Sequence, residues 1–309
     1  MKKTPKKILK NIRSWEITVV RKTILPVAIA TFTFAVLMTG CVKDELFNTP
    51  HPDHGKVAVT ADWTERGEGI AVPKKWTVNI GEYTGEETTA THAPDNLFEP
   101  DEYQITVYNP AGDITVSGTT VTVIATPRDA SCISGQPGWL FTHVQDVVIE
   151  KDTDHEFTAR MKQQVRRLTL TIEPTGDAKD CIVSIEGTLS GVAGTFDMAT
   201  GEHGTPSDVK LAFTKITEGD DTGKWTATVR LLGIAGNMQN LTGTITFADG
   251  NPRPASLESD LTASLKDFNT GKTEPLTLGG TVAETPAEAG VSATINDWKK
   301  VAGDPVEAM

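Results

Sequence analysis

One cysteine of this 309-residue sequence stands where its thiol could be chemically modified. Cys41 follows an uncharged apolar run, Ile24 to Met38, and the small residues Thr39 and Gly40. That run is shorter than the ~20 residues a helix needs to cross a bilayer. A cationic segment, a short apolar run and small residues before a cleavage site are typical of a secretory signal. We therefore expect residues 1–40 to be removed on export, which leaves Cys41 as the first mature residue.

The residues Leu37–Cys41 resemble a lipobox, in which the cysteine receives a diacylglyceryl group and a dedicated peptidase cleaves just before it. An ordinary secretory signal followed by a chance cysteine is the alternative, but a generic signal does not require cysteine at this place. The sequence thus predicts an outer-membrane lipoprotein anchored through acylated Cys41. The next residues resemble the signals that send some lipoproteins to the cell surface, although a short solvated acidic run is the alternative: Lys43, Asp44 and Glu45.

Other residues with reactive or ligating side chains lack the spacing that chemistry requires. The histidines and the acid of His51–His54 lie in a Pro-containing stretch without further ligands, whereas a structural metal site needs about four. Asp220 and Asp221 could contact Ca²⁺, but an isolated acidic pair is usually a solvated turn. Gly271–Thr273 resembles the end of a phosphate-binding loop, yet Lys266 occupies the position of the required first glycine. We therefore predict no catalytic residue, no metal site and no cofactor, so the protein is not expected to be an enzyme.

Charge and cysteine content narrow the function further. The leader holds eight of the 29 Lys and Arg residues and one of the 41 acids, which leaves the mature chain with a formal charge of −19. Such a surface repels phosphate backbones and excludes nucleic acid as an expected partner. Cys132 and Cys181 remain after acylation and could pair in an oxidising compartment. Cys181 shares strand phase with Val183 and Ile185, which favours a buried free thiol, but the sequence leaves both states open.

Alternation of apolar and polar residues predicts an all-β chain. Residues 41–55 are expected to be a lipidated tether, because two prolines resist regular structure there. The patterns then predict an N-terminal β-sandwich over 56–160 and a C-terminal β-sandwich over 161–309, with one short helix over Leu261–Asn269 that starts at an Asp260 N-cap. The strand patterns lie at 57–63, 76–80, 103–107, 119–125, 139–149, 168–172, 181–185, 209–213, 225–231, 241–247, 276–278 and 291–295.

Several motifs together resemble the FimB-type anchor subunits of type V (fimbrillin) pili, which are lipoproteins. They occur in the order Cys41–Asp44, the Trp63 strand, Tyr103–Asn109, Arg166–Thr171 and Ala293–Trp298. The resemblance implies two tandem transthyretin-like β-sandwiches tethered to the outer membrane, exposed at the cell surface. It also implies fimbrial stalk subunits as partners, with subunits joined by β-strand complementation.

The resemblance also singles out Arg66 as a candidate protease-sensitive position. Related stalk subunits lose their first strand to a trypsin-like protease, whereas anchors are thought to keep it. Arg66 follows the first strand pattern in a polar segment of the kind that proteases reach. For an anchor we expect the first strand to stay.

Two other functions fit the sequence less well. A glycan-binding lipoprotein of a nutrient-uptake system would need aromatic platforms, yet tryptophan at apolar strand phase is more often core. The residues concerned are Trp63, Trp76, Trp139, Trp225 and Trp298. A lipid-anchored hydrolase ranks third, because no nucleophile or acid pair is recognisable.

Overall fold

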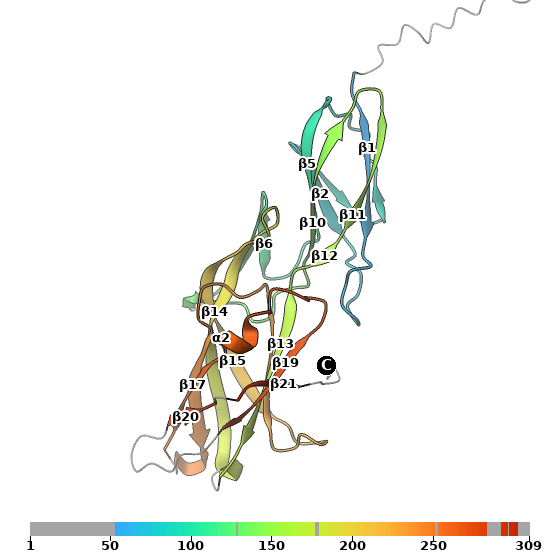
Figure 1. The fold of residues 1–309 in the computed structure, drawn as a ribbon. Helices are drawn as coiled ribbons and strands as arrows, with labels where there is room; N and C mark the ends of the chain where they lie inside the picture. The colour runs from blue at the N-terminus through green and yellow to red at the C-terminus, as the bar shows by residue number, and fades with distance from the viewer. Residues whose placement is uncertain are drawn as a thin grey trace, which may run out of the picture. The chain divides into compact units, whose positions relative to one another are not determined.

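The computed structural model describes residues 53–127, 129–176, 179–250, 253–282, 292–295 and 297–301. Within these residues nearly every element is a β-strand, and the one α-helix, α2 (Thr262–Leu265), has four residues (Figure 1). The all-β class predicted from the alternation is therefore confirmed.

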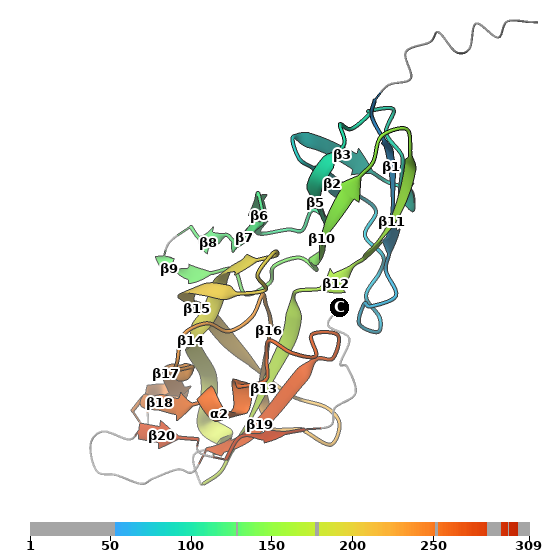
Figure 2. The same cartoon turned by 45° about the horizontal axis from the view of Figure 1, so that its top comes forward.

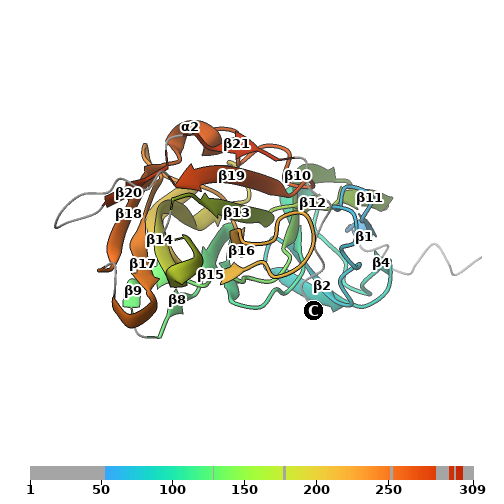
Figure 3. The same ribbon diagram turned by 90° about the horizontal axis from the view of Figure 1, so that it is seen from below.

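Eight strands of the N-terminal part form two sheets that face each other around one hydrophobic cluster. The three-stranded sheet has the order β11-β1-β4, which Figure 3 shows from below, and the five-stranded sheet has the order β12-β10-β5-β2-β3. Buried residues of both sheets make the N-terminal cluster, which includes Val57, Val59, Trp76, Val107 and Phe141. The strands are β1 (Lys56–Asp62), β2 (Trp76–Ile80), β3 (Tyr83–Glu87), β4 (Thr91–His92), β5 (Asp101–Tyr108), β10 (Phe141–Ile149), β11 (Asp154–Arg160) and β12 (Lys162–Gln163).

The remaining strands belong mainly to a 13-stranded sheet with the central order β20-β18-β17-β14-β15-β16-β13-β19-β21. Strand β15 pairs with both β14 and β16, so the two halves of the sheet are continuous. Its strands are β6 (Ile114–Ser117), β7 (Thr120–Val123), β8 (Ala125–Thr126), β9 (Asp129–Ile133), β13 (Arg166–Pro174), β14 (Ile182–Asp197), β15 (His203–Lys215), β16 (Trp225–Leu231), β17 (Asn240–Phe247), β18 (Ala255–Asp260), β19 (Leu276–Val282), β20 (Ser292–Thr294) and β21 (Lys299–Lys300).

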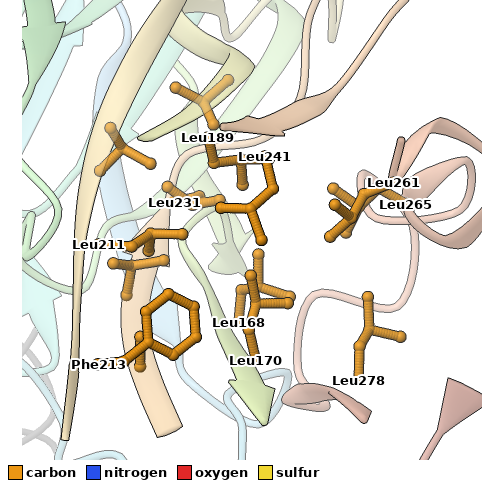
Figure 4. Close-up of a cluster of buried hydrophobic side chains, with 14 of the residues drawn as sticks. Leu168, Leu170, Leu189, Leu211, Phe213, Leu231, Leu241, Leu261, Leu265 and Leu278 are labelled. Atoms are coloured by element: carbon orange, nitrogen blue, oxygen red, sulfur yellow. The ribbon is translucent and has the colours of Figure 1, made fainter. Parts of the chain in front are cut away.

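This sheet encloses the C-terminal cluster, in which leucines of several strands meet those beside α2 (Figure 4). Alternation along β13 turns Leu168 and Leu170 inward, and both are fully buried. They meet Leu278 of β19 together with Leu261 and Leu265. Burial of each such side chain contributes about 1.5–3 kcal/mol, so this cluster is the main source of stability in this part of the chain.

Strands β6 to β9 pair with the C-terminal sheet, although the sequence placed them in the N-terminal sandwich. The strand pattern at 119–125 is present as β7, but β7 pairs antiparallel with β14, and β9 pairs with β15 (Figure 2). Their buried residues Val121, Val123 and Ile133 belong to the C-terminal cluster. A single cut of the sequence near residue 160 therefore does not separate the two clusters. That the chain folds as two units divided near residue 160 stays a prediction.

The predicted burial of Cys181 was wrong. Cys181 and Val183 are exposed, whereas Ile182 and Ile185 are buried. The pairing of β14 with β17 shifts register between Ile182 and Ser184, which changes the phase at the start of the strand. Both Cys132 and Cys181 are free thiols in the structure.

The predicted helix over Leu261–Asn269 is real only over its first turn. Leu261, Leu265 and Phe268 are all buried, as the predicted stripe requires. After Leu265, however, the backbone continues in three-residue turns, with the N–H of Phe268 donating to the carbonyl of Leu265. Arg166 binds the carbonyls of the residues that follow, so those groups do not need helical partners.

Candidate functional site

Of the predicted site residues, the structure describes Arg66, which lies in the loop after the first strand. Cys41, Lys43, Asp44 and Glu45 lie outside the described residues, so acylation and export remain predictions. Arg66 is described, and it lies four residues beyond the end of β1.

Strand β1 lies in the middle of its sheet. It pairs in parallel with β11 over seven residues and antiparallel with β4 at Val59 and Thr60. Alternation turns Val57, Val59 and Ala61 into the N-terminal cluster, where each is at most 6% exposed. Just before β1, Gly55 exchanges two backbone hydrogen bonds with Phe98. The first strand is thus part of the core of the N-terminal sandwich.

The loop from Trp63 to Ala71, here called the Arg66 loop, is closed by its own arginine. The Nε of Arg66 donates to the carbonyl of Ile70 at 3.0 Å, and an Nη donates to the carbonyl of Trp63 at 2.8 Å. A hollow of about 470 Å³ is lined by Thr64 and residues 66–71. A trypsin-like protease must bind the arginine side chain, so cleavage after Arg66 first requires both of these hydrogen bonds to break.

A buried glutamine connects the Arg66 loop to a distant turn. The backbone N–H of Gly67 donates to Oε1 of Gln163 at 2.8 Å, and Nε2 of Gln163 donates to the carbonyl of Lys272 at 2.7 Å. The fit is close, because a Cβ added at Gly67 would lie 2.5 Å from the carbonyl oxygen of Thr273. We call this connection the Gln163 bridge. A protease needs an extended, accessible backbone at its cleavage site, so this bridge would have to break before the Arg66–Gly67 bond could be cleaved.

Lys272 places its ammonium among neutral acceptors. Its Nζ lies 3.0 Å from Oε1 of Gln164, 3.0 Å from Nε2 of His203 and 4.9 Å from the ring centroid of Phe196. Burial, with a smaller contribution from the charge of Arg166, lowers the pKa of Lys272 to about 7. Burial and the charge of Lys272 lower the pKa of His203 to about 4, so His203 is neutral at pH 7 and accepts a hydrogen bond.

Arg166 is the second buried cation of this region. Its guanidinium donates to four backbone carbonyls, those of Asp267, Phe268, Thr270 and Glu274, and burial lowers its pKa. One sequence signal could have revealed it: Arg166 occupies the inward phase of β13, in line with Leu168 and Leu170. An arginine at such a position must find acceptors inside the fold. It holds a turn in place and has no reacting partner.

The chain ends, as far as it is described, in a segment that contacts both outer strands of the C-terminal sheet. Within this closing segment (292–295 and 297–301), β20 pairs in parallel with β18, and β21 pairs antiparallel with β19. Ile295 is fully buried, and Nε1 of Trp298 donates to Oγ of Ser259 at 2.7 Å. The segment therefore makes only short backbone ladders, and buried side chains provide much of its attachment to the sheet.

The five tryptophans of the described residues serve packing. Trp76 and Trp225 are buried in strands, whereas Trp63, Trp139 and Trp298 lie outside strands, contrary to the expectation that all five are strand-borne. The latter three still pack against the two clusters. Their positions give no support to a glycan-stacking surface.

Other candidate chemistry is equally absent from the described residues. In them, no group of three or more His, Cys, Asp or Glu side chains is arranged to hold a metal ion. Asp53 accepts a hydrogen bond from Lys151, while His51 lies outside the described part. No described helix has the length and apolar character needed to span a membrane.

These features define an all-β protein whose buried ionisable groups tie chain segments together. A family model described as fimbrillin-A associated anchor proteins Mfa1 and Mfa2 matches residues 94–302. The chain belongs to this Mfa2 family of fimbrial anchor proteins. Membership implies a structural protein of the cell surface or envelope that associates with fimbrial subunits.

Solved structures show the same fold at low sequence identity. The fimbrial anchor protein Mfa2 from Porphyromonas gingivalis is 13% identical, with a TM-score of 0.52 over 80% of this chain and 97% of that chain. Two proteins from Bacteroides ovatus described as candidate adhesins match with TM-scores of 0.54 and 0.55, at 15% and 11% identity. They cover 82% and 81% of this chain and 96% of each of theirs. No curated protein matches the sequence significantly.

Proposed function

We propose that the protein is a surface lipoprotein that acts as the anchor or an accessory subunit of a type V fimbrium. In this proposal Cys41 carries the lipid that holds the chain in the outer membrane, and Lys43, Asp44 and Glu45 direct it to the outer face. The observation that carries the proposal is the burial of the first strand in the core of its own sandwich, in a member of an anchor family.

Retention of β1 matters because the lipid and the rest of the chain are joined only through it. Cleavage after Arg66 would remove Lys56–Asp62 together with Cys41, and the protein would leave the membrane. The hydrogen bonds of Arg66 and the Gln163 bridge both oppose that cleavage. This protection supports an anchor over a polymerising stalk subunit, which would need its first strand removed.

For the joint between subunits, we propose β-strand complementation at the closing segment. Its two short strands pair with the outer strands β18 and β19, and Ala293 and Ile295 fill the C-terminal cluster between them. An extended strand from a fimbrial subunit would make longer ladders at the same two strands while supplying apolar side chains for the same space.

Substitution of Cys41 tests the anchor. Cys41→Ala should abolish acylation and release the protein from membrane fractions, because one residue carries all of the lipid. Fractionation and intact mass measure the result, and Cys181→Ala, which alters an exposed free thiol, is the matched control. Membrane retention of Cys41→Ala with an unchanged acylation mass would refute the anchor.

The N-terminus of the protein taken from cells separates anchor from stalk. We expect the surface-exposed chain to begin at acylated Cys41 and to co-isolate with fimbrial subunits. A chain that begins at Gly67 would instead assign the protein to a stalk or tip position.

A further inference from the structure

Strand β11 is an edge strand: among the described residues its outer side pairs with no strand, although its end at Arg160 lies beside His143 of β10. In the described residues it pairs only with β1, over seven residues from Asp154 to Arg160, and it ends the three-stranded sheet (Figures 1 and 3). Natural proteins usually keep exposed edges short or irregular, since unpaired backbone groups recruit other strands. A free edge of this length needs an explanation.

Two hydrogen bonds fix which backbone groups of β11 point outward. The N–H of Lys56 donates to the carbonyl of Thr153, and the N–H of Met161 donates to the carbonyl of Asp62. In a parallel ladder alternate residues face the partner strand, so the odd-numbered residues of β11 face β1. The N–H and C=O groups that point away therefore belong to Asp154, Glu156, Thr158 and Arg160. Of these groups, the Arg160 carbonyl lies 3.2 Å from Nδ1 of His143.

The side chains of these same four residues are all exposed and form a directional charge pattern. It runs negative, negative, neutral, positive from Asp154 to Arg160. None of the ion pairs among the described residues includes Asp154, Glu156 or Arg160. In the ladder with β1, Asp154 lies opposite Lys56 and Arg160 lies opposite Asp62, but neither is close enough for an ion pair, so both charges can also act on a partner strand.

We propose that β11 pairs antiparallel with β11 of a second copy of this chain, about a twofold axis at Phe157. Asp154 then lies opposite the second copy's Arg160, and Glu156 lies opposite Thr158, each twice. All four outward-facing residues become hydrogen-bonded pairs, with about eight backbone hydrogen bonds. The partly buried Phe157 of each copy lies at the centre, and the contact is isologous, as in most twofold dimers.

Other registers and the other long edge fit less well. An axis at Glu156 would place that carboxylate against itself. An axis at Thr158 would place Glu156 opposite Arg160, but it shortens the ladder, because Asp154 would then lie opposite Lys162, whose backbone already pairs with Thr142. The edge strand β3 carries Glu86 and Glu87 without a base in the strand, so antiparallel self-pairing there would leave the acids unmatched. Of these two edge strands, only β11 carries acids at one end and a base at the other.

Charge-reversed variants test the pairing in the unlipidated protein from residue 41 to 309 with Cys41→Ala. Sedimentation should show a concentration-dependent dimer that weakens with added salt. Asp154→Arg places two arginines opposite each other, and Arg160→Asp places two aspartates opposite each other, so each variant alone should be monomeric. An equimolar mixture restores both ion pairs in a heterodimer and should dimerise as the parent protein does.

A backbone variant provides a second test that does not depend on charge. Thr158→Pro removes an outward N–H that β1 does not use, so it should abolish the dimer while the thermal midpoint stays close to that of the control Thr158→Ala. A monomeric parent protein at all concentrations, a dimeric Asp154→Arg variant or a monomeric mixture would each overturn the proposal.

Discussion

At the scale of single residues, the protein uses neutral and cationic side chains to hold backbone carbonyls and amides. Arg66, Gln163, Arg166 and Lys272 all donate to carbonyl oxygens of distant or neighbouring turns. Sequence patterns do not show the contacts of Gln163, Arg166 and Lys272 described here, because these join residues far apart in the chain, and the contacts of Arg66 lie within a loop without periodic pattern. The one exception is Arg166, whose inward phase on β13 indicates a buried cation.

The Gln163 bridge should control access of proteases to Arg66. Gln163→Leu leaves the N–H of Gly67 without its acceptor, which costs about 1–3 kcal/mol in a buried position. We therefore expect trypsin-like proteases to produce the fragment starting at Gly67 roughly 5- to 150-fold faster, as measured by mass spectrometry over time. Gln104→Leu, at an exposed site on β5, is the control and should leave this rate unchanged. Equal rates for both variants would mean that the bridge does not protect the loop.

The lowered pKa of Lys272 should make the stability of the protein depend on pH above about 7. This pKa is about 7 in the folded chain, against an ordinary value of 10.5 in the unfolded chain, so between these values the unfolded chain binds more protons. The free energy of unfolding should therefore rise as the pH increases from about 7 towards 10. Lys272→Met should remove this rise, as measured by denaturant unfolding at several pH values, whereas Lys266→Met is the control on the same segment. An unchanged pH slope in Lys272→Met would contradict the burial of the ammonium.

At the scale of elements, alternation predicted strands better than it predicted their partners. The patterns at 57–63, 76–80 and 168–172 correspond to β1, β2 and β13, because one face of each is buried. The pairing of β7 with β14 escaped prediction, since it joins segments some seventy residues apart. The phase at Cys181 failed because a register shift follows it, and the helix after Leu261 shortened because Arg166 takes its later carbonyls.

The closing segment should depend on one aromatic side chain. Trp298 packs against the C-terminal cluster and donates to Ser259, so Trp298→Ala removes buried area and leaves that hydroxyl without its donor. Full burial would give a loss of about 3–5 kcal/mol, and the partial exposure of Trp298 makes this an upper limit. Hydrogen exchange should accelerate in β18 and β19, while the exposed Lys299→Ala serves as control. Unchanged exchange in both strands would show that the segment is held by other contacts.

At the scale of the whole molecule, the two clusters do not follow one cut in the sequence. Val121, Val123, Ile133 and Leu140 all come before residue 160 and are buried in the C-terminal cluster. Together their burial contributes roughly 6–12 kcal/mol, which is comparable to the total stability of a domain. Composition and alternation give the class of fold, but they cannot assign strands to sheets.

Because residues before 160 complete the C-terminal cluster, the starting residue of a fragment should decide whether it folds. A fragment starting at residue 161 should lack a cooperative thermal transition, because it has lost β6 to β9. A fragment starting at Pro110 keeps them and should fold more stably, as circular dichroism during heating can show. A fully folded 161–309 fragment would support a boundary at residue 160 after all.

The parallel pairing of β1 with β11 has a mechanical consequence. The end of β1 that continues towards Cys41 and the end of β11 that continues into β12 and β13 lie at opposite ends of one ladder. In the proposed anchor, tension between the lipid and the C-terminal sheet would therefore slide the two strands lengthwise and strain all seven register positions at once. An antiparallel pair pulled in the same way would open one hydrogen bond after another. The parallel direction of the two strands would thus make the first strand resist the force that a fibre exerts on such an anchor.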